Sequence, residues 1–208
     1  MVKVKICGIT RREDALAAME AGADAIGFVF YDKSPRYISP EAARKIVFSL
    51  PPFISAIGLF VNERAETIVR IAGELALSAV QLHGDESPDF SVRLPLKVIK
   101  AIRVSGEKDL QRIASYHVSA VLLDSFQKGL YGGTGVPLDW KKLQDVEQKT
   151  PLILSGGLTP ENVQEAIQMV APYAVDVSSG VEEKPGIKSA KKMRKFIQNA
   201  KGAVKSKR

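Results

Sequence analysis

Cysteine and long apolar runs are scarce in this sequence. Cys7 is the single cysteine among 208 residues, so no disulfide can form within the chain, and a cytoplasmic location is expected. No apolar run approaches the roughly 20 residues that a helix needs to cross a bilayer. The chain enters directly into a strand pattern, without a signal peptide. Because a hydrophobic content of 45% is ordinary for a soluble globular protein, neither secretion nor membrane attachment is expected.

Motifs for metals and nucleotides are also missing. The 2 histidines and one cysteine form no cluster with the spacing of metal ligands. The first expected strand is followed by Cys7-Gly8-Ile9-Thr10, which is not the glycine fingerprint of a dinucleotide site. We therefore expect no metal and no cofactor.

Positive charge is in excess: the formal net charge is +7, and much of it lies in the last expected helix and the tail after it. One interpretation is an arm that binds nucleic acid; the other is a solvated helix face that ends in a frayed tail at 200–208. The second is favoured, because the one aromatic residue there, Phe196, forms a core-facing stripe with Ile197. No nucleic acid partner is expected, although the basic balance would suit an anionic substrate.

One pattern occurs eight times along the chain: a short apolar or β-branched run, a polar turn and an amphipathic segment. Strands are expected at Val2–Ile6, Ala25–Phe30, Ile54–Phe60, Ala79–Leu82, Lys97–Ile102, Ala120–Asp124, Leu152–Leu154 and Ala174–Val177. Helices are expected near Arg11–Ala21, Pro40–Ser49, Arg64–Leu75, Ser87–Leu94, Lys108–Tyr116, Trp140–Gln148, Pro160–Val170 and Ile187–Ala200. Alternating strands and helices imply a parallel sheet, and eight units of about 26 residues predict an α/β fold, a single (β/α)8 TIM barrel over residues 1–208. A doubly wound open sheet is the alternative, but it would usually carry the missing fingerprint.

Three helix starts carry capping residues. Thr10 and Glu13 match a capping box. Ser39 and Thr159 each precede a proline, which suits the first helical position. These residues predict where three of the helices begin.

Polar residues occur on the strands with a regular alternation. In a barrel one face of each strand meets the helices and the other faces the interior, and the apolar face is expected to meet the helices. Six polar or reactive side chains should therefore point inward: Lys5, Cys7, Gln81, His83, Asp124 and Asp176. Closure makes the first and eighth strands neighbours, so Lys5 and Asp176 are expected to form an ion pair, because buried charge is costly unless it is paired.

Three of these residues, Cys7, His83 and Asp124, lie at the C-terminal ends of strands, where barrels carry their active sites. A free cysteine is otherwise a buried and inert filler in most proteins, and position alone leaves both interpretations of Cys7 open. Arg36 follows the second strand, between a proline and an aromatic residue. Its guanidinium suits a carboxylate, and an exposed arginine without a role is the alternative.

Glycine-rich loops follow the last two strands. Residues 155–160 read Ser-Gly-Gly-Leu-Thr-Pro, and residues 177–182 read Val-Ser-Ser-Gly-Val-Glu. Glycine bares backbone N–H groups to an anion, and barrels often bind phosphate at these two loops. A phosphate site is expected there, with plain tight turns as the alternative. The loop at 125–138, with four glycines, is a candidate lid.

Eight short segments, taken together, resemble the phosphoribosylanthranilate isomerase family of tryptophan biosynthesis. They are KICGIT (5–10), GFVF and KSPRYIS (27–39), GLFVN (58–62), QLHGDE (81–86), LLDS (122–125), GGTG and LDW (132–140), LSGGLTPENV (154–163) and VDVSSGVE (175–182). They occur in order over nearly the whole chain, which makes the set specific. One departure is Val136-Pro137-Leu138, where the family usually has a polar residue and then an aromatic one.

The resemblance implies an Amadori rearrangement, in which N-(5-phosphoribosyl)anthranilate becomes 1-(2-carboxyphenylamino)-1-deoxyribulose 5-phosphate. By the family pattern, Asp124 is the acid that protonates the furanose oxygen, and Cys7 is the base that removes the proton from C2. Cys7 would then need a pKa lowered by nearby positive charge or N–H groups. Asp124 would need a dry, apolar site that keeps it protonated.

The resemblance also assigns the binding residues. Arg36 would hold the anthranilate carboxylate, and His83 would supply a supporting contact. The sugar phosphate would be bound through backbone N–H groups of Gly156, Gly157, Ser179 and Gly180.

Two other functions compete with this one. The sister isomerase of histidine biosynthesis performs the same rearrangement, but that family has an aspartate in place of Cys7 and usually two phosphate sites in similar halves. Here only the second half carries paired glycine loops. A non-catalytic barrel that binds phosphorylated ligands would not need Cys7 and Asp124 together. The expected partner is a small phosphorylated substrate, and the sequence leaves a monomer and a homodimer open.

Overall fold

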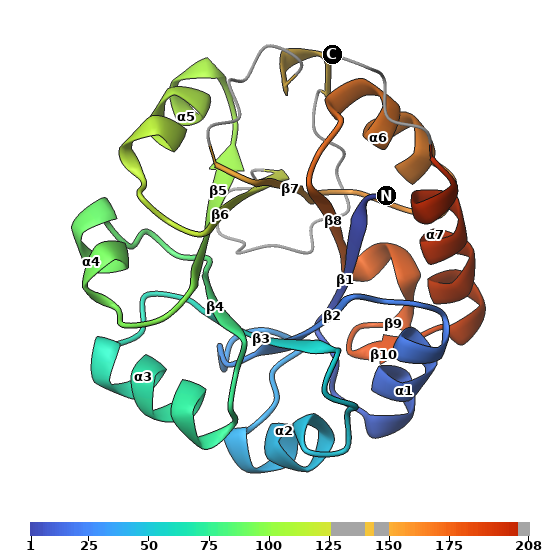
Figure 1. Cartoon of the computed structure of the whole chain (residues 1–208), viewed down its shortest axis with the longest axis horizontal. Helices are drawn as coiled ribbons and strands as arrows, with labels where there is room; N and C mark the ends of the chain where they lie inside the picture. Colours follow the sequence, from blue (N-terminus) through green and yellow to red (C-terminus); the bar gives the residue numbers. More distant parts are fainter. Residues whose placement is uncertain (126–139, 144–149, 204–208) are drawn as a thin grey trace.

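Eight parallel strands close into a barrel in the order in which they occur along the chain (Figure 1). The structure, a computed structural model, describes residues 1–125, 140–143 and 150–203. The strands are β1 (Lys3–Cys7), β2 (Ala25–Val29), β3 (Ser55–Phe60), β4 (Ala79–Leu82), β5 (Val98–Val104), β6 (Ala120–Ser125), β7 (Leu152–Leu154) and β8 (Ala174–Val177). The predicted (β/α)8 barrel is confirmed, and pairing of β1 with β8 excludes the open sheet.

Helices surround the barrel (Figure 1). They are α1 (Arg12–Glu20), α2 (Pro40–Val47), α3 (Ala65–Glu74), α4 (Pro88–Arg93), α5 (Glu107–Gln111), α6 (Val163–Val170) and α7 (Ala190–Gly202). The described residues also form the 3₁₀ segments η1 (Arg112–Ser115), η2 (Trp140–Leu143) and η3 (Ser179–Val181). The helix expected at 108–116 is thus α5 continued by η1. Of the helix expected at 140–148, residues 140–143 form η2, and the rest lies outside the described residues. The candidate lid also lies outside them, apart from Ser125.

The capping predictions have mixed outcomes. Ser39 caps α2, because its hydroxyl accepts from the backbone N–H of Ala42 at 3.2 Å. The capping box at Thr10 is wrong: α1 begins after Arg11 without a side-chain cap, and the Thr10 hydroxyl donates to the carbonyl of Gly186 at 2.5 Å. The prediction at Thr159 is also wrong, because α6 begins three residues later than expected.

A hairpin that the sequence did not predict lies between β8 and α7. It pairs β9 (Glu182–Lys184) with β10 (Ile187–Lys188) in antiparallel register. Its turn contains Gly186, whose φ of 80° lies in the left-handed region that glycine adopts at little cost. The last helix therefore begins at Ala190 rather than at Ile187, because the segment first turns back on itself.

The barrel interior is apolar at one end and polar at the other. A cluster of small and branched residues fills the N-terminal end: Ile57, Ile99, Ala101, Ala120, Leu122, Ile153 and Ala174. Above it lie Lys5, Gln81 and Asp176, all buried. This layering places the polar side chains beneath the open C-terminal ends of the strands, where ligands reach a barrel.

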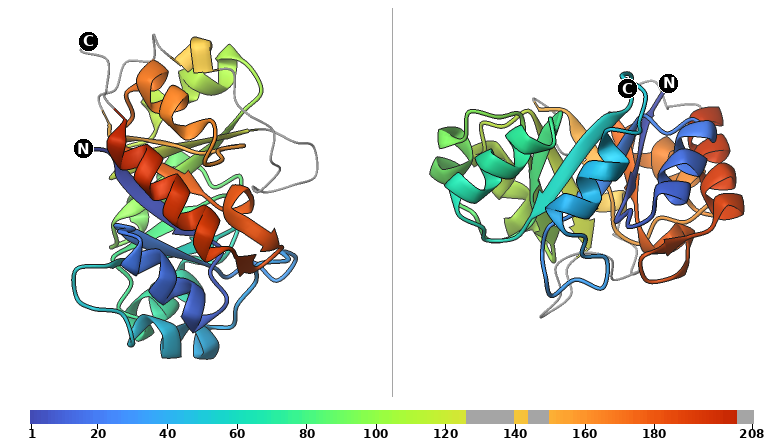
Figure 2. Two further views of the ribbon diagram at one scale, coloured as in Figure 1. Left: turned by 90° about the vertical axis from the view of Figure 1, so that its right-hand side faces the viewer. Right: turned by 90° about the horizontal axis from the view of Figure 1, so that it is seen from below.

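The last helix, α7, packs outside β1 and beside α1 and α6 (Figures 1 and 2). Two of its basic side chains form ion pairs with other parts of the same chain. Lys195 pairs with Glu161 at 2.9 Å, and Lys201 pairs with Asp24 at 3.2 Å. Phe196 and Ile197 are buried on the opposite face. These contacts support the prediction of a solvated helix face. The frayed tail predicted to start at 200 is wrong for its first residues, because α7 continues to Gly202 and Ala200 is buried against the core. No helix in the described ranges is long and apolar enough to cross a membrane.

Candidate active site

Lys5, on β1, is the central cation of the barrel interior. Its ammonium donates to Oε1 of Gln81 at 2.8 Å and to Oδ1 of Asp176 at 3.0 Å. Burial alone would lower the pKa of Lys5, but the charge of Asp176 and the neighbouring Cys7 outweigh it, so the pKa is raised. The predicted Lys5–Asp176 ion pair is confirmed, and Lys5 is a permanent positive charge beneath the site.

His83 links this centre to Asp124 on the far side of the barrel. Its Nδ1 lies 2.8 Å from Nε2 of Gln81, and its Nε2 lies 3.1 Å from Oδ2 of Asp124. The other oxygen of Asp124 accepts from the backbone N–H of Ser125 at 2.9 Å. All these side chains are buried, so the aspartate carboxyl contacts the His83 ring and the Ser125 N–H group away from bulk water.

Cys7 ends β1 at the same opening, with 5% of its surface exposed. Gly27 on β2 makes room for it, because a Cβ there would lie 2.8 Å from the Cys7 sulfur. Burial raises the pKa of Cys7, and Asp176 adds to the rise, while Lys5 and Lys188 act in the opposite direction. The prediction of a lowered pKa is therefore wrong for this structure, because burial of the thiol, with the charge of Asp176, outweighs the effect of Lys5 and Lys188.

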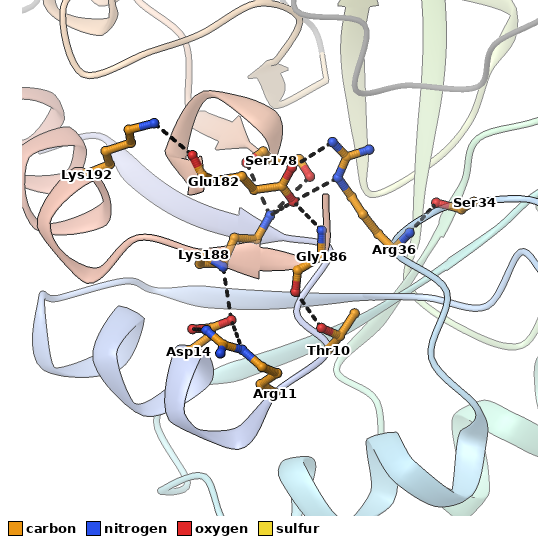
Figure 3. Close-up of polar contacts among 10 residues, drawn as sticks. All are labelled: Thr10, Arg11, Asp14, Ser34, Arg36, Ser178, Glu182, Gly186, Lys188 and Lys192. Carbon is orange, nitrogen blue, oxygen red and sulfur yellow. Dashed lines mark hydrogen bonds and ion pairs between the residues drawn. The ribbon is translucent and has the colours of Figure 1, made fainter. Parts of the chain in front are cut away.

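Arg36 approaches the opening from the loop after β2 (Figure 3). Its Nε and Nη2 donate to the two carboxylate oxygens of Glu182 at 2.9 and 2.8 Å. Its aliphatic stem crosses Gly8, where an added Cβ would lie 2.6 Å from Cδ of Arg36. The pair with Glu182 fixes one edge of the guanidinium and leaves the edge formed by Nη1 and Nη2 for a second carboxylate.

One pocket brings most of the predicted side chains together. Cys7, Arg36, His83 and Asp124 all line it, and the other lining residues are Val29, Tyr31, Ser34, Leu59, Gln81, Ser155, Asp176 and Ser178. In the described part of the chain, no group of three or more His, Cys, Asp or Glu side chains is placed to hold a metal ion. A thiol, a carboxyl and a guanidinium thus line one pocket.

The two glycine loops form an adjoining hollow. Gly156, Gly157 and Ser179 line it together with Asp124. Gly156 and Gly157 have φ values of 79° and 64°, in the left-handed region. Gly180 does not line the hollow but packs against it from behind, since an added Cβ would overlap the carbonyl oxygen of Leu158. Three of the four residues predicted to bind phosphate therefore line the hollow. The fourth, Gly180, packs against the backbone of the other loop.

A family model described as N-(5'phosphoribosyl)anthranilate (PRA) isomerase matches residues 4–199. The chain belongs to this family. The isomerase of Trichlorobacter lovleyi is 53% identical over 205 residues, which cover 98% of this chain and 100% of that protein. The crystal structure of the Thermotoga maritima isomerase aligns with a TM-score of 0.92 at 50% identity, over 97% of this chain and 100% of that one.

A second solved member of the phosphoribosylanthranilate isomerase family contains a bound molecule. It is a complex with reduced 1-(o-carboxyphenylamino)-1-deoxyribulose 5-phosphate, and it aligns with a TM-score of 0.87 at 50% identity over 97% of this chain and 100% of that one. That molecule carries a carboxylate and a phosphate. The present site has a guanidinium at one side and glycine loops at the other, which are groups of the kind that bind such anions.

Sequence reasoning about this isomerase missed Glu182 and Lys188. Both are buried, and Nζ of Lys188 lies 2.8 Å from Oε1 of Glu182 (Figure 3). The available signal was the dipeptide Pro185-Gly186, which marks a turn and would have placed these two residues on facing strands.

Proposed function

We propose that this isomerase converts N-(5'-phosphoribosyl)anthranilate to 1-(2-carboxyphenylamino)-1-deoxyribulose 5-phosphate through proton transfers at Asp124 and Cys7. The isomerisation is the step of tryptophan biosynthesis that the family performs. The observation that carries the assignment of roles is the shared pocket, in which a buried thiol and a buried carboxyl face the same space.

Asp124 acts first, as the general acid. It gives its proton to the furanose ring oxygen, the ring C–O bond breaks, and the substrate nitrogen supplies the electron pair that forms a Schiff base. Asp124 is then a carboxylate that accepts from His83 and from the backbone of Ser125. These donors are already in place, so the new charge is stabilised without rearrangement.

Cys7 acts second, as the general base. Its thiolate removes the proton from C2 of the Schiff base, and the electron pair of that C–H bond forms an enolamine, which tautomerises to the ketone. The raised pKa makes the thiolate scarce at neutral pH but more basic once it is formed. A positioned base of this kind contributes about 10²–10⁴-fold, and no covalent intermediate is required.

The groups proposed to bind the two anionic ends of the substrate are the Arg36 guanidinium and the glycine loops. The free edge of Arg36 would hold the anthranilate carboxylate, and the N–H groups of Gly156, Gly157 and Ser179 would hold the phosphate. Gly180 would act by keeping the two loops in contact. Fixing both ends of the substrate places C2 and the ring oxygen between Cys7 and Asp124.

The test is turnover of phosphoribosylanthranilate, followed by its fluorescence, in wild type, Cys7→Ala and Asp124→Ala. Each variant is expected to lose about 10²-fold or more in kcat and to retain binding of the reduced product, measured by calorimetry. Wild-type turnover by either variant would refute its role. Turnover of only the histidine-pathway substrate by the wild type would instead favour the sister isomerase.

We propose that the protein is a homodimer in the cytoplasm. One solved relative is described as monomers generated from the dimeric isomerase of Thermotoga maritima, which supports a homodimer over a monomer. The unpaired Cys7 supports a cytoplasmic location. Light scattering on the full chain tests the first point, and a mass of one chain would contradict it.

A further inference from the structure

Four buried side chains form one hydrogen-bonded row beneath the active site. Nζ of Lys5 lies 2.8 Å from Oε1 of Gln81, and Nε2 of Gln81 lies 2.8 Å from Nδ1 of His83. Nε2 of His83 then lies 3.1 Å from Oδ2 of Asp124. At most 4% of any of these residues is exposed. With this burial, the row must satisfy its own donors and acceptors.

The Lys5 ammonium at one end of the row determines which group donates and which accepts in each hydrogen bond. An ammonium group has donors and no acceptor, so Lys5 must face the amide oxygen of Gln81 and not its nitrogen. The amide nitrogen, which only donates, then faces Nδ1 of His83. That ring nitrogen must accept, so it carries no hydrogen. In a neutral imidazole the hydrogen is then on Nε2, where it points to Asp124.

The opposite arrangement is unfavourable in this site. Rotating the Gln81 amide by half a turn would place its NH₂ group against the Lys5 ammonium, and both are donors. Asp176 holds Lys5 in place at 3.0 Å, so the ammonium cannot easily move away. Two buried donors would then face each other without a hydrogen bond, which costs free energy in a dry interior.

We propose that Lys5 and Gln81 are positioning residues that hold His83 as the tautomer with its hydrogen on Nε2. This inference rests on the proposed function, in which Asp124 is the general acid. In this tautomer the Nε2–H group donates to Oδ2 of Asp124, and the backbone of Ser125 donates to the other oxygen. The row thus orients a donor toward the carboxylate that ring opening creates.

The tautomer can be read directly by NMR of the full chain labelled with ¹⁵N-histidine. The chain has 2 histidines, and His117 is exposed, so His117→Gln assigns the spectrum without touching the site. Near pH 8, the long-range ¹H–¹⁵N spectrum is expected to show His83 with a protonated Nε2 and a bare Nδ1. The reverse pattern, or a mixture of the two forms, would overturn the proposal.

Gln81→Glu tests the direction of the row. A glutamate offers one oxygen to Lys5 and the other to Nδ1, so the hydrogen of His83 is expected to move to Nδ1, which leaves Nε2 bare toward Asp124. Gln81→Met, which offers neither group, is expected to give both tautomers. In Gln81→Glu, kcat should fall by about tenfold or more, within the roughly 10²–10³-fold lost when a donor to a reacting oxygen is removed. KM should change by less than about threefold, because the binding loops are untouched.

The outcomes separate this inference from the proposed function. If Gln81→Glu inverts the tautomer and kcat stays at the wild-type value, the positioning role is wrong and the isomerase assignment stands. If the wild type does not turn over phosphoribosylanthranilate, the proposed function fails, and the wild-type spectrum still decides the tautomer. Should Gln81→Glu not fold by circular dichroism, Gln81→Met and the wild-type spectrum carry the test.

Discussion

Arg36 and Glu182 lie 146 positions apart in the sequence and are joined by two parallel hydrogen bonds of 2.8 and 2.9 Å. Lys188 approaches the same carboxylate at 2.8 Å. Burial would raise the pKa of Glu182, but the hydrogen bond from Arg36 and the charge of Lys188 outweigh it and hold the pKa below its ordinary value. A charged carboxylate thus orients the arginine that lines the proposed substrate pocket.

Glu182→Gln should therefore weaken substrate binding more than chemistry. The amide keeps the size of the side chain but removes the charge that holds Arg36 at the pocket, so we expect KM to rise by about tenfold, with a smaller change in kcat. Steady-state kinetics on phosphoribosylanthranilate measures both. The matched control is Glu161→Gln, which removes an exposed ion pair with Lys195 and should leave both constants unchanged. A wild-type KM in Glu182→Gln would argue against this orientation of Arg36.

The same carboxylate should contribute to stability in an acid-dependent way. Since the folded pKa of Glu182 is lower than its unfolded value near 4.5, its contribution is present above pH 4.5 and is lost as pH falls through the folded value. Urea unfolding from pH 7 downward should show a larger loss in wild type than in Glu182→Gln. At pH 7 the variant should be less stable by about 3–5 kcal/mol, because Lys188 and Arg36 remain as unpaired cations. Parallel pH curves for the two proteins would contradict the lowered pKa.

The Cys7 thiol should lose its proton only at alkaline pH. A base must lose its proton before it acts, and burial raises the pKa of this thiol above its ordinary value of 9.0. We therefore expect the thiolate of the free enzyme to form mainly beyond pH 9. Thiolate absorbance near 240 nm reports the same titration and is unambiguous, because Cys7 is the sole cysteine; Cys7→Ala supplies the blank. A thiolate already formed at pH 7 would sink this prediction.

The strand periodicity of the sequence was enough to predict the barrel and its polar interior. Alternation along a strand is a local property, and closure makes β1 and β8 neighbours, so the sequence alone could pair Lys5 with Asp176. The resemblance added the roles proposed for Cys7 and Asp124. Local periodicity and family likeness thus supplied most of the residues of the candidate site.

Contacts that depend on the path of a loop could not be predicted in the same way. Lys100 on β5 has the parity of residues that face the helices, yet it is buried, with its ammonium 2.6 Å from Oε2 of Glu86 and 2.8 Å from the carbonyl of Gly84. Its acceptors come from the loop after β4, whose course no period in the sequence reveals. The pair of Arg36 with Glu182 was missed for the same reason.

Gly180→Ala should separate the two glycine loops. A methyl group there would overlap the carbonyl oxygen of Leu158, and backbone on both sides leaves no flexible side chain to move aside. We expect binding of the reduced product, measured by calorimetry, to weaken by about tenfold or more, while Cys7 and Asp124 keep their places and kcat changes less.

The matched control is Gly73→Ala in α3, where a Cβ meets nothing within 4 Å. That substitution should leave binding unchanged and stabilise the fold by about 0.5–1 kcal/mol, because alanine favours the helix. If both variants bind the product as wild type does, contact between the two loops is not what forms the phosphate site, and the N–H groups of Gly156 and Gly157 would have to hold the phosphate without support from the loop after β8.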